Sequence, residues 1–503
     1  MAEHCDVVIV GAGLSGIGAA CHFQRKCPNK SFVLLEGREA TGGTWDLFRY
    51  PGIRSDSDMY TLGYGWKPWL GEKAIADGAS ILSYVRETAL ENDIDAKIRL
   101  GHKVIAASWS SERAQWTVEA ERGPEREPVR FTCRFLYAAP GYYAYDAGYT
   151  PEFAGRDEFA GRIVHPQHWP EDLDYAGKRV VVIGSGATAM TLVPAMAKQA
   201  AEVVMLQRSP SYVVSAPARD PIAAFLRELF SEKVAYALTR WKNVILGMLF
   251  FHLPRLLPGL AKRALIALAR RDLAPDYDVE RHFTPRYNVW DQRVCLVPDG
   301  DLFEAIRAGK VTVVTDHIER FTRDGIRLRS GQELAADLII TATGLQMLPL
   351  GGLAFTVDGR RIEPSQTMNY KGCMFSGLPN LAYAFGYTNA SWTLKADLTA
   401  EYVCKLLNHM DAVGAVRCVP RVPDRTIEER PWLDFTSGYV QRSLALFPKQ
   451  GSKRPFRVYQ NYAFDLFTLR HGLIDDGTLE LTPAAALAEP IAALPSTSED
   501  PAQ

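Results

Sequence analysis

One arrangement of apolar and polar positions occurs twice along the chain. An apolar, β-branched run is followed at once by glycine, then by a helix-like stretch and a second apolar run. The elements are a strand at 6–10, a helix at 14–23 and a strand at 31–35, and again a strand at 180–183, a helix to about 199 and a strand at 202–206. Strand, turn, helix and strand form a βαβ unit. The pattern predicts an α/β protein with two Rossmann-like dinucleotide-binding domains.

A third region has a different pattern. Residues 221–275 are apolar, basic and helix-prone, and they separate the second unit from later strands near 311–314 and 338–340. We expect a helical insertion that packs on the second domain and lines a substrate channel, because most amphipathic helices face a core. The alternative is a patch on a membrane surface, with basic side chains facing lipid headgroups. These basic residues are Lys242, Arg255, Lys262, Arg263, Arg270 and Arg271.

The first glycine turn carries a dinucleotide-binding fingerprint. Gly11, Gly13 and Gly16 fit the spacing G-x-G-x-x-G between a strand and a helix. The first glycine permits the tight turn, the second lets the backbone approach a pyrophosphate, and the third allows close helix–strand packing. Glu36 ends the next strand, 20 residues after Gly16, where an acid accepts a hydrogen bond from a ribose hydroxyl.

The second glycine turn has the same form but a different charge. Gly184 and Gly186 are followed by Thr188, and alanine replaces the third glycine. The next strand ends in Arg208 and Ser209 rather than in an acid. A guanidinium at this position can bind a 2′-phosphate, which an acid would repel. The second site is therefore predicted to prefer NADPH to NADH, the alternative for Arg208 being a solvated surface arginine.

Two further glycine-containing segments indicate which cofactor binds at each of the two nucleotide sites. Gly43, Thr44 and Trp45 follow the first acid and suggest backbone that passes close to a flat ligand, and a late strand ends in 342–344. This order is common in proteins that hold both FAD and NAD(P)H, so we assign FAD to the first site and NADPH to the second. The expected domains are an FAD-binding domain at 1–145 and 376–482, an NADPH-binding domain at 150–220 and 311–375, a helical insertion at 221–310 and a disordered tail at 483–503.

Composition narrows the class of protein further. The 503 residues carry 57 Lys and Arg against 58 Asp and Glu, so no overall field favours nucleic acid. The 8 cysteines form no C-x-x-C pair and have no zinc-ligand spacing, which predicts reduced thiols and no metal site. No basic region followed by an apolar core opens the chain. We expect a cytoplasmic protein, with peripheral membrane contact only in the alternative reading of 221–275.

A longer motif precedes the second βαβ unit. Phe159, Gly161, His165 and Trp169, with Pro170, fit F-x-G-x-x-x-H-x-x-x-W-P. This motif resembles the fingerprint of type I Baeyer–Villiger monooxygenases. The segments "GGTWDLFRYPGIRSDSDMYTLGY", "HPQHWPEDLDY" and "GYTNASWTLKADL" look like the subgroup that contains the ethionamide-activating monooxygenase. The resemblance spans roughly residues 1–480 and implies that the fingerprint lies between the two domains and couples their motion to catalysis.

The resemblance also implies a reaction. An enzyme of this family uses NADPH and O₂, forms a C4a-peroxyflavin and inserts oxygen into ketones to give esters or lactones, and it also oxidises sulfides. Arg293, in "WDQRVCLV", matches the family's catalytic arginine, and Asp56, in "YPGIRSD", matches the acid that pairs with it. A fixed guanidinium stabilises a peroxide anion in a low-dielectric pocket. Asp58 is the adjacent alternative to Asp56, and Gln292 replaces a lysine that helps many members bind NADPH.

Three other functions compete with this interpretation. A flavin monooxygenase that acts mainly on sulfur or nitrogen would share both sites, and a non-catalytic nucleotide-binding flavoprotein would share the fold. A disulfide reductase would need a redox cysteine pair, which the sequence lacks. The expected partners are a small ketone or sulfide and molecular oxygen, with no nucleic acid.

Overall fold

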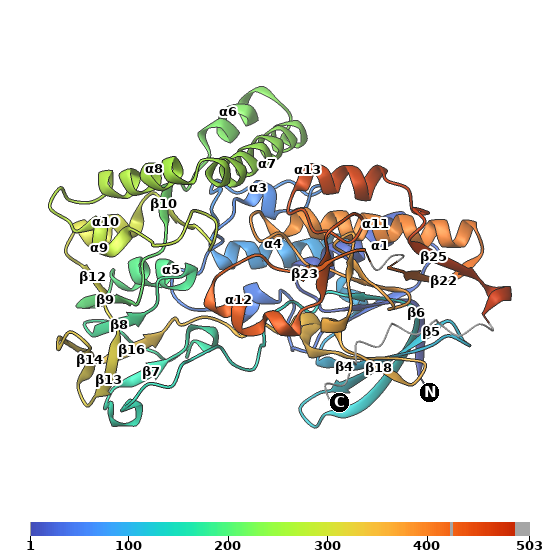
Figure 1. The fold of residues 1–503 in the computed structure, drawn as a ribbon, viewed down its shortest axis with the longest axis horizontal. Helices are drawn as coiled ribbons and strands as arrows, with labels where there is room; N and C mark the ends of the chain where they lie inside the picture. Colours follow the sequence, from blue (N-terminus) through green and yellow to red (C-terminus); the bar gives the residue numbers. More distant parts are fainter. Residues whose placement is uncertain (1, 423–425, 488–503) are drawn as a thin grey trace.

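The computed structural model describes residues 2–422 and 426–487, which form two lobes with a layer of helices along one edge (Figure 1). The first lobe contains a nine-stranded sheet in the order β18-β17-β4-β5-β6-β1-β2-β3, with β21 paired to β6. Its strands are β1 (Glu3–Val10), β2 (Phe32–Leu35), β3 (Ile98–Arg99), β4 (His102–Ser110), β5 (Gln115–Arg122), β6 (Glu127–Ala138), β17 (Ala354–Val357), β18 (Arg360–Ile362) and β21 (Leu381–Tyr383).

The parallel strands of this sheet hold the core of the first lobe. In β1, Val8 lies opposite Val33 of β2 and Leu136 of β6, and all three side chains are buried. Strands covered on both faces are apolar throughout, which explains the uninterrupted apolar run at 7–10. The helices α1 (Leu14–Lys26), α4 (Gly78–Glu91) and α11 (Trp392–Ala412) pack together beside the sheet.

The second lobe contains an all-parallel sheet of five strands in the order β12-β9-β8-β16-β7. They are β7 (Arg162–Val164), β8 (Arg179–Ile183), β9 (Glu202–Gln207), β12 (Val311–Thr315) and β16 (Leu338–Thr341). The helices α5 (Ala187–Met196) and α10 (Asp301–Arg307) pack beside this sheet. Smaller sheets add β10 (Val213–Ala216) with β11 (Cys295–Pro298), and β13 (Ile318–Thr322) with β14 (Gly325–Leu328) and β15 (Glu333–Ala335). The predicted α/β fold with two Rossmann-like units is confirmed.

The predicted insertion is helical over most of its length. It consists of α6 (Pro221–Leu229), α7 (Glu232–Leu256), α8 (Pro258–Arg271) and α9 (Val279–Phe283), and α6 to α8 run along the upper edge in Figure 1. The predicted end at 310 is too late. β11 pairs with β10, and α10 packs on α5 and β12, so both elements belong to the second lobe.

Two linkers join the lobes and bond to each other. They lie at about 139–149 and 342–348, where the Ala144 amide donates to Gln346 and the Tyr149 amide donates to Gly344. The predicted boundary at 375 differs from the structure, because β17 and β18 return to the first sheet, where β17 runs parallel to β4. That pairing joins segments about 250 residues apart, so it cannot be predicted from the pattern of neighbouring residues.

The C-terminal part of the chain completes the first lobe. Its elements are β19 (Asn369–Tyr370), β20 (Met374–Phe375), β22 (Ala415–Pro420), β23 (Glu429–Pro431), α12 (Gly438–Ser443), β24 (Lys449–Gly451), α13 (Tyr462–Asp465) and β25 (Leu479–Pro483). Within the predicted tail, Pro483 pairs with Ala415 and Leu487 packs on the core of the first lobe, so the tail begins later than 483. The remaining part of that prediction, 488–503, lies outside the described residues.

Candidate active site

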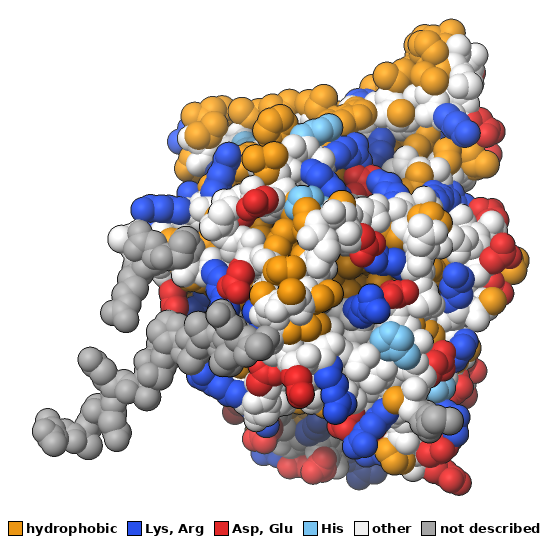
Figure 2. Space-filling view, turned by 90° about the vertical axis from the view of Figure 1, so that its right-hand side faces the viewer, with side chains coloured by type: hydrophobic (Ala, Val, Ile, Leu, Met, Phe, Trp, Pro, Cys, Tyr) orange, Lys and Arg blue, Asp and Glu red, His pale blue; other side chains and the backbone are white. Residues whose placement is uncertain are grey.

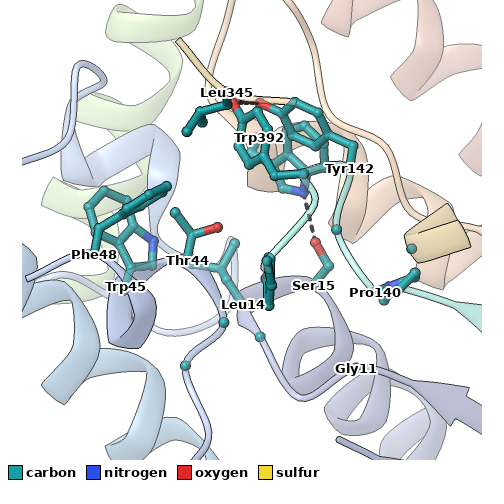
Figure 3. A pocket seen from close by; sticks show the side chains of 18 of the residues that line it. Gly11, Leu14, Ser15, Thr44, Trp45, Phe48, Pro140, Tyr142, Leu345 and Trp392 are labelled. Carbon is teal, nitrogen blue, oxygen red and sulfur yellow. Dashed lines mark hydrogen bonds between the residues drawn. The ribbon is translucent and has the colours of Figure 1, made fainter. Parts of the chain in front are cut away.

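A cavity of about 480 Å³ opens where the two lobes meet, and both glycine turns contribute to its wall. Residues of the first turn and the segment after Glu36 line a large part of it, whereas Ala187, Thr188 and Thr191 of α5 line the side toward the second lobe. Figure 3 shows Trp45 and Phe48 on one side of the cavity and Tyr142, Leu345 and Trp392 on the other. The cavity is thus shared by the two predicted nucleotide sites.

The first glycine turn leaves no room for side chains. Gly11 has φ +96°, and a Cβ atom there would lie 2.4 Å from the carbonyl oxygen of Ala139. A Cβ atom on Gly16 would lie 1.9 Å from the carbonyl oxygen of Gly11. Gly13 and Leu14 line the cavity where α1 begins, and a helix N-terminus is suited to bind phosphate. This backbone cradle fits the pyrophosphate of a dinucleotide.

Glu36 lies in the wall of the same cavity and is only 6% exposed. Its carboxylate accepts hydrogen bonds from the Ala12 amide at 2.8 Å and from the Arg38 amide at 3.0 Å. Burial raises the pKa of Glu36, while the two amide donors oppose that rise. The carboxylate is therefore held rigidly at the end of β2, in the position that the sequence predicts for the ribose contact.

The segment after Glu36 closes around the cavity. Gly43 has φ +56° and precedes the short helix α2 (Thr44–Leu47), so Thr44 and Trp45 both line the cavity. An ion pair of 2.7 Å between Arg38 and Asp46 holds this segment in place. The predicted close passage of backbone beside a ligand matches this geometry.

Aromatic residues that the sequence analysis did not single out complete the wall. Tyr142 stacks on Trp392 with ring centroids 4.8 Å apart, and the Trp392 indole donates to the Ser15 hydroxyl at 2.8 Å (Figure 3). Tyr143 and Tyr387 also line the cavity. The sequence signals them only through the aromatic residues at 142–145 and through the segment around 387–392. The second of these segments is one of those that carry the family resemblance.

The second glycine turn is more open than the first. Gly184 has φ +136°, and a Cβ atom there would lie 2.3 Å from the carbonyl oxygen of Ala342, but a Cβ on Gly186 would meet nothing within 4 Å. Thr188 lines the shared cavity. The turn therefore has the backbone form of a dinucleotide site while leaving its central glycine open to solvent.

Arg208 and Ser209 lie outside the cavity, at the exposed end of β9. The Ser209 carbonyl accepts from the Ser185 hydroxyl at 3.0 Å, which ties the strand end to the glycine turn. Within 2–422 and 426–487, Arg208 makes no hydrogen bond or ion pair. Its guanidinium is thus available beside the turn, as a 2′-phosphate contact requires.

Arg293 and Asp56 meet at the cavity. The Arg293 Nε lies 2.7 Å from the Asp56 Oδ2, and their side chains are 36% and 32% exposed. Asp56 raises the pKa of Arg293 above its ordinary value, so the guanidinium is a permanent cation. Both residues line the cavity, with Tyr142 and Tyr143 close by.

Asp58, the alternative partner, has a different role. Its carboxylate caps α3 (Met59–Leu62) by accepting from the Thr61 amide at 3.0 Å. It also accepts from the Asn243 side chain of α7 at 2.8 Å. Asp58 therefore holds two helices, and Asp56 is the acid beside Arg293. Gln292 is half-buried next to Arg293.

The fingerprint residues do not line the cavity, and one of them, His165, contacts a linker. His165 Nε2 lies 3.1 Å from the Gly344 carbonyl and Nδ1 accepts from the Gln167 amide at 3.2 Å, so the ring is neutral with its proton on Nε2. Burial lowers the pKa of His165. Because Gly344 belongs to the second linker, His165 fixes that linker to the edge of the second sheet.

The other three fingerprint residues have packing roles. Phe159 is buried in the core between the second sheet and β13–β15, and a Cβ on Gly161 would lie 2.5 Å from the Asp337 carbonyl. Trp169 is half-buried against Tyr175. All eight cysteines are buried and free, and in the part of the chain that the structure describes no cluster of His, Cys, Asp and Glu could hold a metal.

Comparison with known proteins extends this description. Residues 9–70 match the NAD(P)-binding Rossmann-like domain, and residues 75–242 match the flavin-binding monooxygenase-like family. Over 477 residues the chain is 57% identical to the FAD-containing monooxygenase EthA of Mycobacterium tuberculosis, covering 95% of this chain and 97% of that protein. EthA of Mycolicibacterium smegmatis is 52% identical over 483 residues, covering 96% and 98%.

Solved structures share the fold at low sequence identity. A steroid monooxygenase bound to NADP superposes with a TM-score of 0.75 at 22% identity, covering 95% of this chain and 99% of that one. Cyclohexanone monooxygenase from Rhodococcus sp. Phi1, bound to NADP⁺, gives 0.73 at 18% identity, covering 96% and 100%. These comparisons place both lobes in one known architecture.

Fold and site together define a two-lobed flavin-dependent monooxygenase, and the family resemblance noted in the sequence is confirmed. The chain belongs to the family of FAD-containing monooxygenases that includes EthA.

Proposed function

We propose that this protein is an NADPH- and O₂-dependent monooxygenase that inserts oxygen into ketones, with FAD held by the first lobe. The observation that carries the proposal is the Arg293–Asp56 pair, which places a permanent cation in the cavity shared by the two glycine turns. The family relationship supports the enzyme class, and the pair supports this reaction within that class.

The first lobe has the residues to hold FAD. The turn at Gly11–Gly16 would take the pyrophosphate, and Glu36 would accept from a ribose hydroxyl. Thr44, Trp45 and Tyr142 would enclose the ring system, since they line opposite sides of the cavity (Figure 3). Bound FAD, reduced by NADPH, supplies the redox chemistry by which dioxygen is activated.

Arg293 supplies the charge that this chemistry needs. Oxygen gains negative charge when dioxygen is reduced, and again when a ketone carbonyl is attacked. A preorganised cation in a site shielded from water stabilises such charge more than water does. Asp56 orients the guanidinium through Nε, which leaves the two terminal nitrogens free to point at reacting oxygen atoms. Tyr142, Tyr143 and Trp392 line the cavity with this pair, and bound cofactors would cover more of it.

The second lobe has the residues to hold NADPH. The turn at Gly184–Gly186 would take its pyrophosphate, and Arg208 would bind the 2′-phosphate. The family's usual lysine is replaced by Gln292, so Arg208 carries more of the preference for NADPH. Because Thr188 lines the shared cavity, a nucleotide bound here reaches toward the flavin site.

The cavity wall favours apolar ketones over charged substrates. The large apolar and aromatic side chains that line it include Tyr142, Leu345, Leu348 and Trp392. Oxidation of sulfur or nitrogen is the alternative, because the reduced oxygen species that attacks a ketone also oxidises sulfur or nitrogen once that species is protonated. A fixed cation opposes that protonation, so the arrangement favours attack on a carbonyl.

The test is turnover of the purified holoenzyme with NADPH under labelled dioxygen. A plain aliphatic ketone and a thioether of similar size are offered separately, and products are identified by mass spectrometry. We expect label in an ester from the ketone, and loss of ester in Arg293→Ala by a factor on the order of 100 or more with flavin retained. Sulfoxide without any ester would favour the alternative, and no NADPH consumption with either substrate would indicate a non-catalytic flavoprotein.

A further inference from the structure

The helices α6, α7 and α8 expose an unusual number of large apolar side chains. We call this surface the apolar ridge, and it follows the upper edge of the molecule in Figures 1 and 2. Its exposed members are Ile222, Phe225, Leu229, Phe230, Val234, Leu238, Trp241, Ile245, Leu246, Leu249, Phe250, Leu253, Leu256, Leu257, Leu260 and Leu268. Contiguous apolar surface of this kind marks an interaction site.

The ridge is the outer face of helices whose inner faces are already packed. Along α7, exposed positions recur every three or four residues from Val234 to Leu256, whereas Tyr236, Val244 and Phe251 on the other side are buried. Val244 packs against Tyr387 and Leu394 of the first lobe. Trp241 and Phe250 contact Tyr462 and Trp290 at the margin of the outer face, but the face is otherwise exposed among the described residues, and the helices are packed through their inner sides.

The ridge is fixed firmly to the rest of the molecule. Arg240 of α7 is buried and donates to the carbonyls of Tyr60 and Gly63, each at 2.7 Å. The Trp290 indole donates to the Phe250 carbonyl at 2.7 Å, and Lys262 of α8 donates to the Pro285 carbonyl. Such hydrogen bonds attach α7 and α8 to the body of the molecule, so their apolar face is presented as a rigid unit.

Basic residues accompany the ridge. Residues 221–271 contain Glu228 and Glu232 as their only acids, against nine bases. The bases are Arg227, Lys233, Arg240, Lys242, Arg255, Lys262, Arg263, Arg270 and Arg271. Lys242, Arg255, Arg270 and Arg271 pair with acids outside this range or at its edge. Lys233 and Arg263 are exposed and make no hydrogen bond or ion pair with any described residue.

We propose that the apolar ridge docks on the surface of an anionic lipid bilayer. Apolar side chains on one face of a helix, with Lys and Arg beside them, are typical of helices that lie in the membrane interface. Free cations such as Lys233 and Arg263 complement anionic headgroups near the surface. Ridge side chains such as Leu256, which is 73% exposed at the corner between α7 and α8, would enter the acyl boundary.

A second copy of the chain is a poorer occupant. In a two-fold symmetric contact the same patch meets itself, so the bases of one ridge would face those of the other. The ridge also stands out from the body where α6 and α7 project beyond both lobes (Figure 1). A projecting, basic, apolar surface fits a flat anionic layer better than its own copy.

The ridge would lie on the bilayer rather than cross it. No single helix among residues 2–422 and 426–487 has the length and hydropathy of a membrane span. α7 and α8 reach that hydropathy only together, and they are bent by 118° at their junction. Their inner faces remain packed on the two lobes, which leaves only the outer face for lipid.

Co-sedimentation of the purified full-length holoenzyme with vesicles tests the proposal. One set of vesicles contains phosphatidylglycerol with phosphatidylcholine, and the other contains phosphatidylcholine alone. The ridge variant combines Ile245→Glu and Leu249→Glu. The control variant combines Leu90→Glu in α4 and Val413→Glu at the end of α11, which add the same charge at exposed apolar positions outside the ridge. Flavin content, melting temperature and size by light scattering show that each variant is folded and report its oligomeric state.

We expect wild type and control to bind the anionic vesicles, and binding to weaken as salt is raised. The ridge variant should bind about tenfold less or weaker still, because two apolar side chains that would enter lipid become charged. Absence of binding at low salt would overturn the proposal, as would equal binding by the ridge variant. A wild-type dimer that the ridge variant converts to a monomer would assign the ridge to a second copy instead.

Discussion

The two glycine turns have the same backbone motif but differ in how deeply they are built into the molecule. Gly11 and Gly16 are buried, and added side chains there would strike backbone oxygen atoms. Gly186 is exposed, and an added Cβ would meet nothing. The charged residue at the end of the second strand of each unit shows the same difference. Glu36 is buried and accepts two hydrogen bonds, whereas Arg208 is exposed and makes no hydrogen bond with any residue that the structure describes.

This difference distinguishes a resident cofactor from one that exchanges. A cofactor that stays bound can be enclosed, because its site need not open during each cycle. A nucleotide that enters and leaves needs a site whose contacts lie near solvent. The first turn, enclosed by Trp45 and Tyr142, has the form of the resident site, and the second has the form of the exchanging site.

The largest expected effect comes from adding the same methyl group to both turns. Gly16→Ala places a Cβ 1.9 Å from the Gly11 carbonyl oxygen, so the turn must distort. We expect protein that purifies without flavin or does not fold, as measured by visible absorbance and thermal melting. Gly186→Ala should retain flavin and a wild-type melting temperature while raising the KM for NADPH. Equal loss of flavin in both variants would remove the proposed division between the turns.

The second-largest expected effect comes from a substitution in the Arg293–Asp56 pair, which lies in the cavity shared by the two sites. Asp56→Asn removes the charge that orients Arg293 while keeping its shape. We expect flavin content to be unchanged and ester formation to fall about 10- to 100-fold, equivalent to roughly 1.4–2.7 kcal/mol in the barrier. The ratio of NADPH consumed to ester formed should rise, which a purely structural defect would not cause. Asp58→Asn, the neighbouring control, should mainly lower the melting temperature, because Asp58 caps α3.

A smaller effect tests the exposed side of the second turn. Arg208→Ala removes the proposed 2′-phosphate contact, and a charged hydrogen bond of this kind contributes roughly 1.5–3 kcal/mol. We expect the KM for NADPH to rise about tenfold while that for NADH is nearly unchanged. Arg113→Ala removes an exposed arginine from the first lobe and serves as the control. A parallel rise for both nucleotides would show that Arg208 does not read the phosphate.

The smallest effect concerns the linkers between the turns. His165 has a lowered pKa in the folded protein, so below about pH 6.5 the unfolded chain binds a proton that the folded protein resists. Wild-type stability should therefore fall as the pH is lowered through this range. His165→Gln keeps a donor for Gly344 but cannot titrate. Melting temperatures between about pH 7 and pH 5 should fall more steeply for wild type than for the variant, and parallel curves would contradict the assignment.

The sequence predicted local features better than distant contacts. Both βαβ units and the place of Glu36 follow from strand, glycine and acid spacing within about 30 residues. The match of Arg293 with Asp56 required the family resemblance, because 236 positions separate them and spacing alone left Asp58 open. The return of β17 to the first sheet carried no local signal, since its pairing depends on a strand far away.

The apolar ridge shows a second limit of sequence reasoning. The amphipathic pattern of 221–275 indicated helices correctly, but it could not say which apolar face would be covered. That depends on how far the two lobes extend beneath the helices, which is a property of the whole fold. The expectation of an insertion packed on the second lobe fits α8, whereas α7 packs on the first lobe, and the expectation did not address the outer face.

The placement of Arg293 and Asp56 has a practical consequence for protein engineering. Arg293 belongs to a loop of the second lobe, whereas Asp56 follows a segment in which Phe48 and Tyr50 pack on the second lobe while the Ser55 amide donates to Ala76 of the first. A chimera that exchanged the second lobe with that of a relative would separate this matched pair. Such a graft needs to carry residues 48–58 along with the transplanted lobe, even though the chain order assigns them elsewhere.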